Sequence, residues 1–94
     1  MKLLLIDDHA LFREGVAALV EQRMPGVALH LAGDLNAARS VLAAHPDCRL
    51  ALLDLGLPDS HGLDGIARLR ELAPALPIVV LSADDRPETV LGAI

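Results

Sequence analysis

The sequence predicts an α/β domain in which a parallel sheet carries helices on both faces, a doubly wound arrangement. Four short runs of aliphatic residues alternate with segments whose apolar residues recur at helical spacing. The aliphatic runs are continuous rather than alternating, which is typical of strands that are buried on both faces. Strands that alternate with helices form parallel sheets with right-handed crossovers.

The first strand and helix are expected before residue 26. The run Leu3–Ile6 is predicted to be a strand that is buried on both faces. Helical spacing follows, and Pro25-Gly26 ends that helix. One side of the helix is expected to be apolar and the other charged: the apolar residues are Leu11, Val16, Leu19 and Val20, and the charged ones are Arg13, Glu14, Glu21 and Arg23.

The middle of the chain repeats this alternation twice. Residues 27–32 are the second expected strand, and Asp34 is a suitable N-cap for a second helix that ends at residues 45–47. The third strand is Leu50–Leu53, and a loop with glycine and proline leads from it into a third helix. The apolar positions are Leu35, Ala38, Val41 and Leu42 in the second helix, and Leu63, Ile66, Leu69 and Leu72 in the third.

The last part of the chain is expected to hold a fourth strand, Ile78–Leu81, after a turn that contains Pro74 and Pro77. Asp85 and Glu88 have the spacing of a capping box at the start of a fourth helix. A doubly wound sheet seldom ends within a helix, so the 94 residues are expected to be one domain cut from a longer protein.

Composition excludes several classes of function. The net charge is −5, which argues against sequence-independent binding of nucleic acid by this domain, although another domain could still bind DNA. Cys48 is the sole cysteine, so an intrachain disulfide and a thiolate metal site are excluded. Four apolar residues before Asp7 are too few for a signal peptide or a membrane span, so we expect a cytoplasmic protein that does not bind membranes.

Three carboxylates follow two of the expected strands. Asp7 and Asp8 end the first aliphatic run, and Asp54 ends the third. If these strands are neighbours in a parallel sheet, their carboxyl ends bring the three carboxylates to one edge. Such a cluster needs a cation or a raised pKa, because like charges repel. The sequence therefore predicts an acidic, metal-assisted pocket.

Simpler interpretations of the same residues stay open at this point. Asp7 and Asp8 would also suit the N-cap of the first helix, and Asp54 would suit a solvated strand end. His9 lies beside the pocket in sequence, but a surface histidine at the start of a helix is the more common case. The other histidines have no metal-ligand spacing and are expected to be structural or solvated; they are His30, His45 and His61.

Three motifs, taken in order, resemble the receiver domain of two-component response regulators, in the NarL/LuxR-type class with a LuxR-type helix-turn-helix output. The motifs are LLIDDHALFREG at residues 4–15, LDLGLPDSHGL at residues 53–63 and VLSA at residues 80–83. The resemblance implies a flavodoxin-like (CheY-like) sheet with strand order 2-1-3-4-5. Residues 1–94 would then be an incomplete receiver domain that lacks the fifth strand and the last helix, with the DNA-binding output domain outside this chain.

The resemblance also implies roles for individual residues. Asp54 matches the phosphoacceptor, and Ser82 matches the switch hydroxyl that binds the phosphoryl group. Asp8 and Asp54 match carboxylate ligands of Mg²⁺, with Asp7 helping to hold the ion and the backbone carbonyl of Gly56 completing the protein ligands. The implied partner is a sensor histidine kinase, and the implied role is regulatory rather than enzymatic.

The sequence departs from the family pattern at two places. The family has a lysine at the end of its fifth strand, whereas the sole lysine here is Lys2, and His61 stands where Asp or Asn is usual.

Without a fifth strand, residues 78–81 would be an open edge, which predicts self-association through the fourth strand or fourth helix, as a homodimer or by exchange of elements.

Three other functions compete with phosphorylation-controlled signalling. An interaction module that keeps the fold but works without phosphorylation is the main alternative. A phosphohydrolase with an aspartyl nucleophile usually has a second acid two residues later, and Gly56 stands at that position. Dinucleotide binding is disfavoured because no glycine-rich turn follows the first strand.

Overall fold

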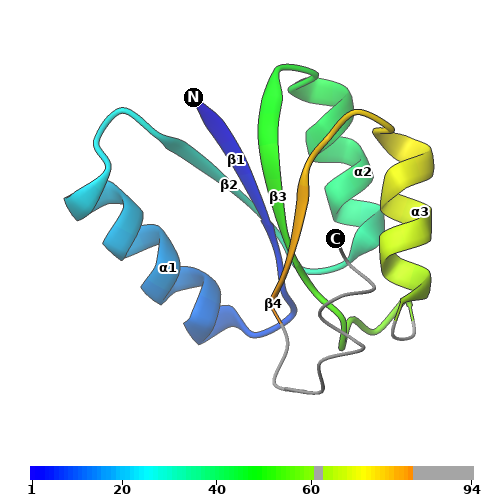
Figure 1. The fold of residues 1–94 in the computed structure, drawn as a ribbon. Helices are drawn as coiled ribbons and strands as arrows, with labels where there is room; N and C mark the ends of the chain where they lie inside the picture. Colours follow the sequence, from blue (N-terminus) through cyan, green and yellow to red (C-terminus); the bar gives the residue numbers. More distant parts are fainter. Residues whose placement is uncertain (61–62, 82–94) are drawn as a thin grey trace.

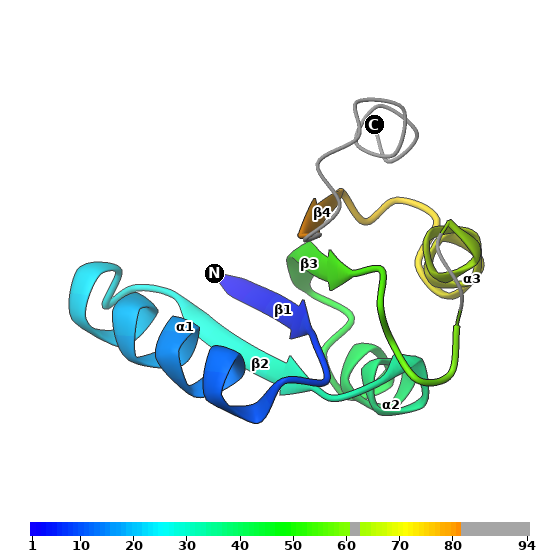
Figure 2. The same cartoon turned by 90° about the horizontal axis from the view of Figure 1, so that it is seen from below.

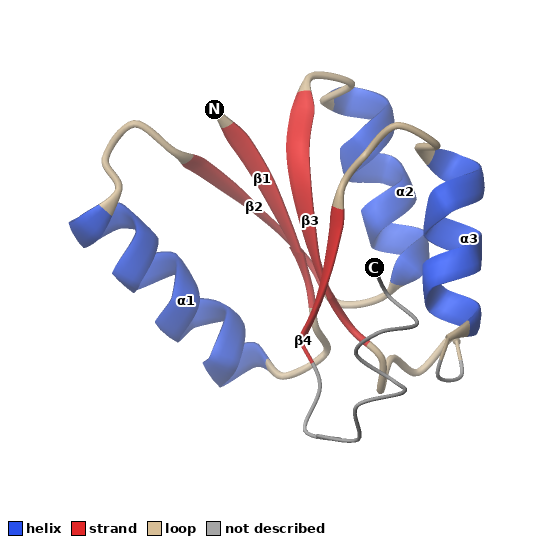
Figure 3. Cartoon of the chain, viewed as in Figure 1, coloured by secondary structure: helices blue, strands red, loops and turns tan. Residues whose placement is uncertain are grey.

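The computed structural model describes residues 1–60 and 63–81. Four strands form one sheet in the order β2-β1-β3-β4, and all three pairings are parallel (Figure 3). The predicted α/β class and the order of the first four strands are confirmed. The strands are β1 (Lys2–Ile6), β2 (Ala28–Ala32), β3 (Cys48–Asp54) and β4 (Ile78–Leu81).

Helices cover both faces of this sheet, as expected. Helix α1 (Ala10–Arg23) lies on one face, and α2 (Leu35–Ala44) and α3 (Asp64–Leu72) lie on the other (Figures 1 and 2). Strand β3 begins two residues before the expected Leu50, at Cys48. None of the described helices is both long and apolar enough to cross a membrane.

Strand β1 is the centre of the molecule. Its residues Leu3–Ile6 are all buried, which confirms the prediction of a strand covered on both faces. Leu4 and Ile6 belong to the core between the sheet and α2 and α3, together with Leu53 and Leu69. Successive side chains of a strand point to opposite faces, so Leu3 and Leu5 point towards the α1 side.

The expected orientation of α1 is wrong in part, because Val16 and Val20 are half-buried as predicted but the two leucines are not. Leu11 is 84% exposed and Leu19 is 56% exposed, whereas Arg13 is half-buried and donates a hydrogen bond of 2.6 Å to the backbone carbonyl of Asp7. An arginine combines an apolar stem with a charged end, so it can cover a sheet and still satisfy a polar group. The hydrophobic pattern placed Arg13 on the solvent side, so the predicted rotation of α1 about its own axis differs from the observed one.

The amino end of α2 is held by two aspartates. Asp34 accepts a hydrogen bond of 2.7 Å from the backbone N–H of Ala37, which confirms it as the N-cap. The carboxylate of Asp59, in the loop after β3, accepts from the backbone N–H groups of Leu35 and Asn36, both at 3.1 Å. The two side chains satisfy three N–H groups that a helix cannot pair internally, and Asp59 ties the β3–α3 loop to α2.

Strand β4 is one end of the described sheet. It pairs with β3, and among the described residues no other strand pairs with it. Val79 is 46% exposed on this strand. The expected fourth helix with Asp85 and Glu88 lies outside the described residues, as do Ser82 and His61.

Candidate functional site

The structure brings the three predicted aspartates together at the carboxyl end of the sheet. Asp7 and Asp8 directly follow β1, and Asp54 is the last residue of the adjacent β3. One ligand atom from each of Asp7, Asp8, His9 and Asp54 lies within 4.8 Å of the others. We call these four residues the acidic cluster. Its roles in binding a metal and accepting a phosphoryl group stay predictions at this point.

The two oxygens of the Asp54 carboxylate have different surroundings. Oδ1 accepts a hydrogen bond of 3.1 Å from the backbone N–H of Gly56. Oδ2 is buried and has no hydrogen-bond partner in the described part of the chain, and the whole side chain is 13% exposed. Nδ1 of His9 lies 3.8 Å from this oxygen, which is within ion-pair distance but too long for a hydrogen bond. A buried carboxylate oxygen without a hydrogen bond is costly, so this atom favours a cation or a reacting group beside it.

The backbone around Asp7 fixes that residue in place. Its N–H donates to the carbonyl of Ala32 on β2 at 3.0 Å, and its carbonyl accepts from the guanidinium of Arg13 on α1. The Asp7 side chain is buried, and its Oδ1 accepts from the backbone N–H of His9 at 2.7 Å. Asp7 is therefore positioned by β2 and α1 at once.

His9 lies closer to the carboxylates than the sequence indicated. Its Nδ1 is 2.6 Å from Oδ1 of Asp7 and 3.2 Å from Oδ1 of Asp8. The hydrogen bond that the His9 ring donates to Asp7, followed by the negative charges of Asp7 and Asp8, raises the pKa of His9 above its ordinary value. The ring is still 69% exposed, so the expected surface position at the start of a helix is also correct.

The alternative in which Asp7 or Asp8 caps α1 is wrong. The N-cap residue is His9, and its side chain makes no capping hydrogen bond. The carboxylates are turned towards Asp54 across the sheet edge instead, within reach of a shared ligand. The placement of the Asp7 and Asp8 carboxylates near Asp54 therefore favours a cation site over a helix cap.

The donor atoms of the acidic cluster fit Mg²⁺. Magnesium prefers oxygen ligands and usually binds one or two carboxylates while it keeps several waters. Asp7, Asp8 and Asp54 provide carboxylate oxygens, and the unpaired Oδ2 of Asp54 is available for such a bond. Gly56 follows β3 two residues after Asp54. A Cβ built on this glycine would lie 3.7 Å from Oδ1 of Asp54, so residue 56 lies directly beside the carboxylate.

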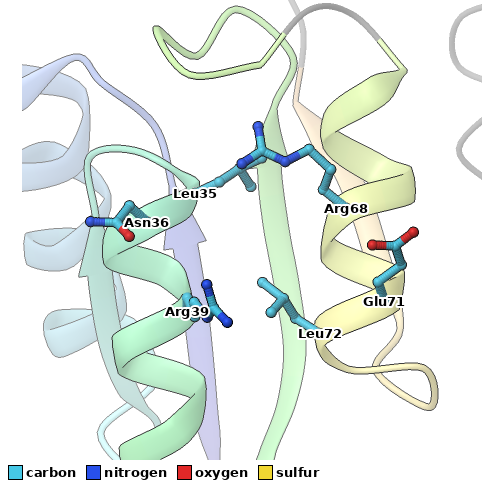
Figure 4. Close-up of a pocket in the computed structure, with 6 residues that line it drawn as sticks. All are labelled: Leu35, Asn36, Arg39, Arg68, Glu71 and Leu72. Atoms are coloured by element: carbon cyan, nitrogen blue, oxygen red, sulfur yellow. The ribbon is translucent and has the colours of Figure 1, made fainter.

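A separate cleft lies between α2 and α3. Arg39 from α2 and Arg68 from α3 both point into it (Figure 4). Arg68 also donates to the backbone carbonyl of Asp59. The cavity has a volume of about 230 Å³, and none of the residues that line it belongs to the acidic cluster. The residues that line it are Leu35, Asn36, Arg39, Arg68, Glu71 and Leu72.

The chain is similar to a known protein family and to individual known proteins. Residues 3–94 match the family model of the response regulator receiver domain. The chain is 42% identical over 93 residues to the glycerol metabolism activator of Pseudomonas putida, in an alignment that covers 99% of this chain and 42% of that protein. The chain therefore spans about two-fifths of the length of this curated relative.

Two solved structures share the fold. One is a response regulator from Burkholderia pseudomallei with a phosphorylated aspartic acid, a calcium ion and citrate, at a TM-score of 0.81 and 30% identity, over 98% of this chain and 52% of that one. The other is the signal receiver domain of the response regulator NarL from Mycobacterium tuberculosis, at a TM-score of 0.80 and 32% identity, over 98% of this chain and 73% of that one.

Proposed function

The chain belongs to the response regulator receiver domain family, and from that premise we propose that Asp54 accepts a phosphoryl group from a sensor histidine kinase. Receiver domains are regulatory modules of two-component systems. The observation that carries the proposal is the state of Asp54: one carboxylate oxygen is held by the N–H of Gly56, and the other is buried without a partner at the point where Asp7 and Asp8 converge.

The proposed reaction is a transfer from nitrogen to oxygen. A carboxylate oxygen of Asp54 forms a bond to phosphorus while the bond between phosphorus and the donor imidazole breaks, and the released imidazole nitrogen gains a proton. The product is an acyl phosphate. The hydrogen bond from the backbone N–H of Gly56 to Oδ1 orients the carboxylate for this attack.

We propose Mg²⁺ as the cofactor. Asp7, Asp8, Asp54 and the backbone carbonyl of Gly56 would hold it, in agreement with the oxygen-rich donor set. When bound, the cation offsets the repulsion between the carboxylates and the incoming phosphoryl group. The chain itself supplies the fixed positions: Arg13 and β2 hold the backbone of Asp7, and the end of β3 presents Asp54.

The downstream part of the proposal concerns signal output. We propose that Ser82 is the switch hydroxyl that binds the phosphoryl group. We also propose that the parent protein controls transcription through a LuxR-type domain, and that this domain, outside this chain, binds the DNA.

Self-association through β4, as a homodimer or by exchange of elements, is proposed because β4 pairs on one side within the described residues and exposes Val79.

A second candidate function is an interaction module that works without phosphorylation. One observation favours it for these 94 residues only: the sole lysine among them, Lys2, begins β1, whereas Asp54 ends β3. Its ammonium group donates to Asp47 at 3.1 Å there, so it is not placed to contact a phosphoryl group on Asp54. A charged hydrogen bond to the phosphate is typically worth about 1.5–3 kcal/mol.

Intact-mass spectrometry after incubation with acetyl phosphate and Mg²⁺ tests the proposal. We expect the mass of one phosphoryl group to be gained by the chain and by the control Asp64→Asn, whose side chain is exposed on α3. The variant Asp54→Asn should gain none, because an amide is a poor nucleophile. No gain in the unaltered chain would favour the interaction module, and sustained release of phosphate over many turnovers would favour a phosphohydrolase.

A further inference from the structure

A second group of ionisable side chains lies on the α2 side of the sheet, near its amino end. His30 is on β2, and His45 is the residue that ends α2. Their rings are stacked, with centroids 4.0 Å apart and an angle of 26° between the planes. We call His30 and His45 the histidine pair. The pair therefore joins the edge strand of the sheet to the last turn of a helix.

The neighbours of the pair require a neutral ring at His45. The ammonium Nζ of Lys2 lies 3.1 Å from Nδ1 of His45 and 3.1 Å from Oδ1 of Asp47. An ammonium group has three donors and no acceptor, so this hydrogen bond exists only if Nδ1 of His45 carries a lone pair. A proton on Nδ1 would break the bond and place two positive charges side by side.

His30 is equally unsuited to a positive charge. Its Nε2 is buried and has no hydrogen-bond partner among the described residues, so a proton on it would find no acceptor. Burial, followed by the nearby His45 and Lys2, lowers the pKa of His30 below its ordinary value. Asp47 alone acts in the opposite direction, and it is already bonded to Lys2.

The charged groups around the pair come from every element that meets there. Strand β1 contributes Lys2, the end of α2 contributes His45, and the turn into β3 contributes Asp47. The amino group of Met1 donates to the carbonyl of Gly26, in the turn before β2, at 3.3 Å. Lys2 and Asp47 therefore face the two imidazoles, and a proton added to either ring makes the local charge more positive.

From this geometry we propose that the histidine pair is an acid-sensitive switch: it holds the end of α2 against β1 and β2 while both rings are neutral, and it opens when either ring is protonated. Opening would separate the His30 ring from the His45 ring and release Lys2 from His45, while the Lys2–Asp47 pair stays intact. The acidic cluster at the other end of the sheet takes no part in this change.

The sign of the effect follows from proton binding. A histidine whose folded-state pKa is lowered binds fewer protons in the folded chain than in the unfolded chain. The stabilisation is complete above the unfolded value of about 6.5 and is lost as the pH falls through the folded-state value. Between the two values, the contribution of His30 raises the unfolding equilibrium constant by up to tenfold for each unit by which the pH falls.

Urea unfolding of the 94-residue chain between pH 8 and pH 5, followed by circular dichroism, tests the switch. We expect the unaltered chain to lose stability below about pH 6.5. In His30→Leu the part of this slope that is due to the pair should vanish, and His45→Gln should act in the same way. The difference between the profiles isolates the pair from His9 and the carboxylates. Equal slopes in the unaltered chain and both variants would overturn the proposal.

Ring titration by NMR keeps the proposal testable if the variants do not fold. In the unaltered chain, the ring signals of His30 should titrate below the ordinary histidine value, and amide exchange near His30 and His45 should accelerate over the same pH range. Lys2→Gln should move the His30 midpoint upwards, because it removes one of the cations that oppose protonation. A His30 midpoint at or above the ordinary value, or one that Lys2→Gln leaves unchanged, would overturn the proposal.

Discussion

The acidic cluster and the histidine pair place the same residue type in opposite electrostatic surroundings. At the carboxyl end of the sheet, Asp7 and Asp8 surround His9 and raise its pKa. Near the amino end, burial and the positive neighbours of His30 lower its pKa. His30 lies on β2, and His9 follows β1 as the N-cap residue of α1. The charge state of a histidine in this fold is therefore set by its immediate neighbours and its burial.

The two regions also differ in how they are built. The acidic cluster needs only two adjacent parallel strands that end in carboxylates, so it follows directly from the sheet. The histidine pair depends on how the end of α2 packs against β2. Helix α2 is held at both ends, since Asp59 from the β3–α3 loop accepts from its amino end and His45 follows its last turn.

The largest expected effect is on Mg²⁺ binding, and it would separate the two regions most clearly. Asp8→Asn removes one charged ligand and should weaken Mg²⁺ binding by about 30- to 150-fold, equivalent to about 2–3 kcal/mol. Isothermal titration calorimetry measures this change. Asp64→Asn is the matched control, and Lys2→Gln should leave the affinity nearly unchanged. Equal losses in Asp8→Asn and Asp64→Asn would contradict a specific site.

The next effect is on α2, the helix that ends at the histidine pair. Asp59→Ala leaves the N–H groups of Leu35 and Asn36 without partners and should lower the free energy of unfolding by about 1–2 kcal/mol. Asp34→Ala should cost about 1 kcal/mol by the same reasoning. Urea unfolding measures both. A change below a few tenths of a kcal/mol in Asp59→Ala would show that the loop does not hold α2 in solution.

A smaller effect is expected far from both regions. Gly15 is exposed within α1, and a Cβ added there would meet no atom within 4 Å. Gly15→Ala should therefore raise the free energy of unfolding by about 0.5–1 kcal/mol through helix propensity. Thermal unfolding is the measurement. A loss of stability would indicate that the exposed side of α1 is covered in solution.

The smallest energetic effect is expected at His9, because its ring is mostly exposed. Without metal, His9 should titrate above its ordinary pKa value. Its contribution to stability is present below the unfolded value of about 6.5 and is lost as the pH rises through the raised folded value. Saturating Mg²⁺ should lower the NMR midpoint of His9, since the cation offsets the carboxylates. An unchanged midpoint would place the cation elsewhere.

The sequence predicted that Asp7, Asp8 and Asp54 converge, because their placement depends on strand order, whereas the contacts of His9 with them were not predicted. Aliphatic runs that end at Asp8 and Asp54 meet whenever β1 and β3 are neighbours. The exposure of Leu11 and Leu19 was not predictable from hydrophobic spacing, because Arg13 covers the sheet with its apolar stem. Hydropathy treats arginine as polar along its full length.

The histidine pair and the role of Asp59 were also missed, for a different reason. His30 and His45 meet only because α2 packs back onto β2, and their spacing along the chain has no periodic signal. Asp59 caps a helix that begins 24 residues before it, whereas capping patterns are read within a few residues. Contacts of this kind depend on tertiary packing.

Paramagnetic broadening by Mn²⁺, used in place of Mg²⁺, tests the central claim most directly. We expect trace Mn²⁺ to broaden first the amide signals of residues 7–9 and 54–56, and added Mg²⁺ to restore them by competition. Signals from His30 and His45 should stay sharp at the same concentration. Broadening that begins at the histidine pair, or that is unaffected in Asp54→Asn, would contradict a divalent-cation site built by Asp7, Asp8 and Asp54.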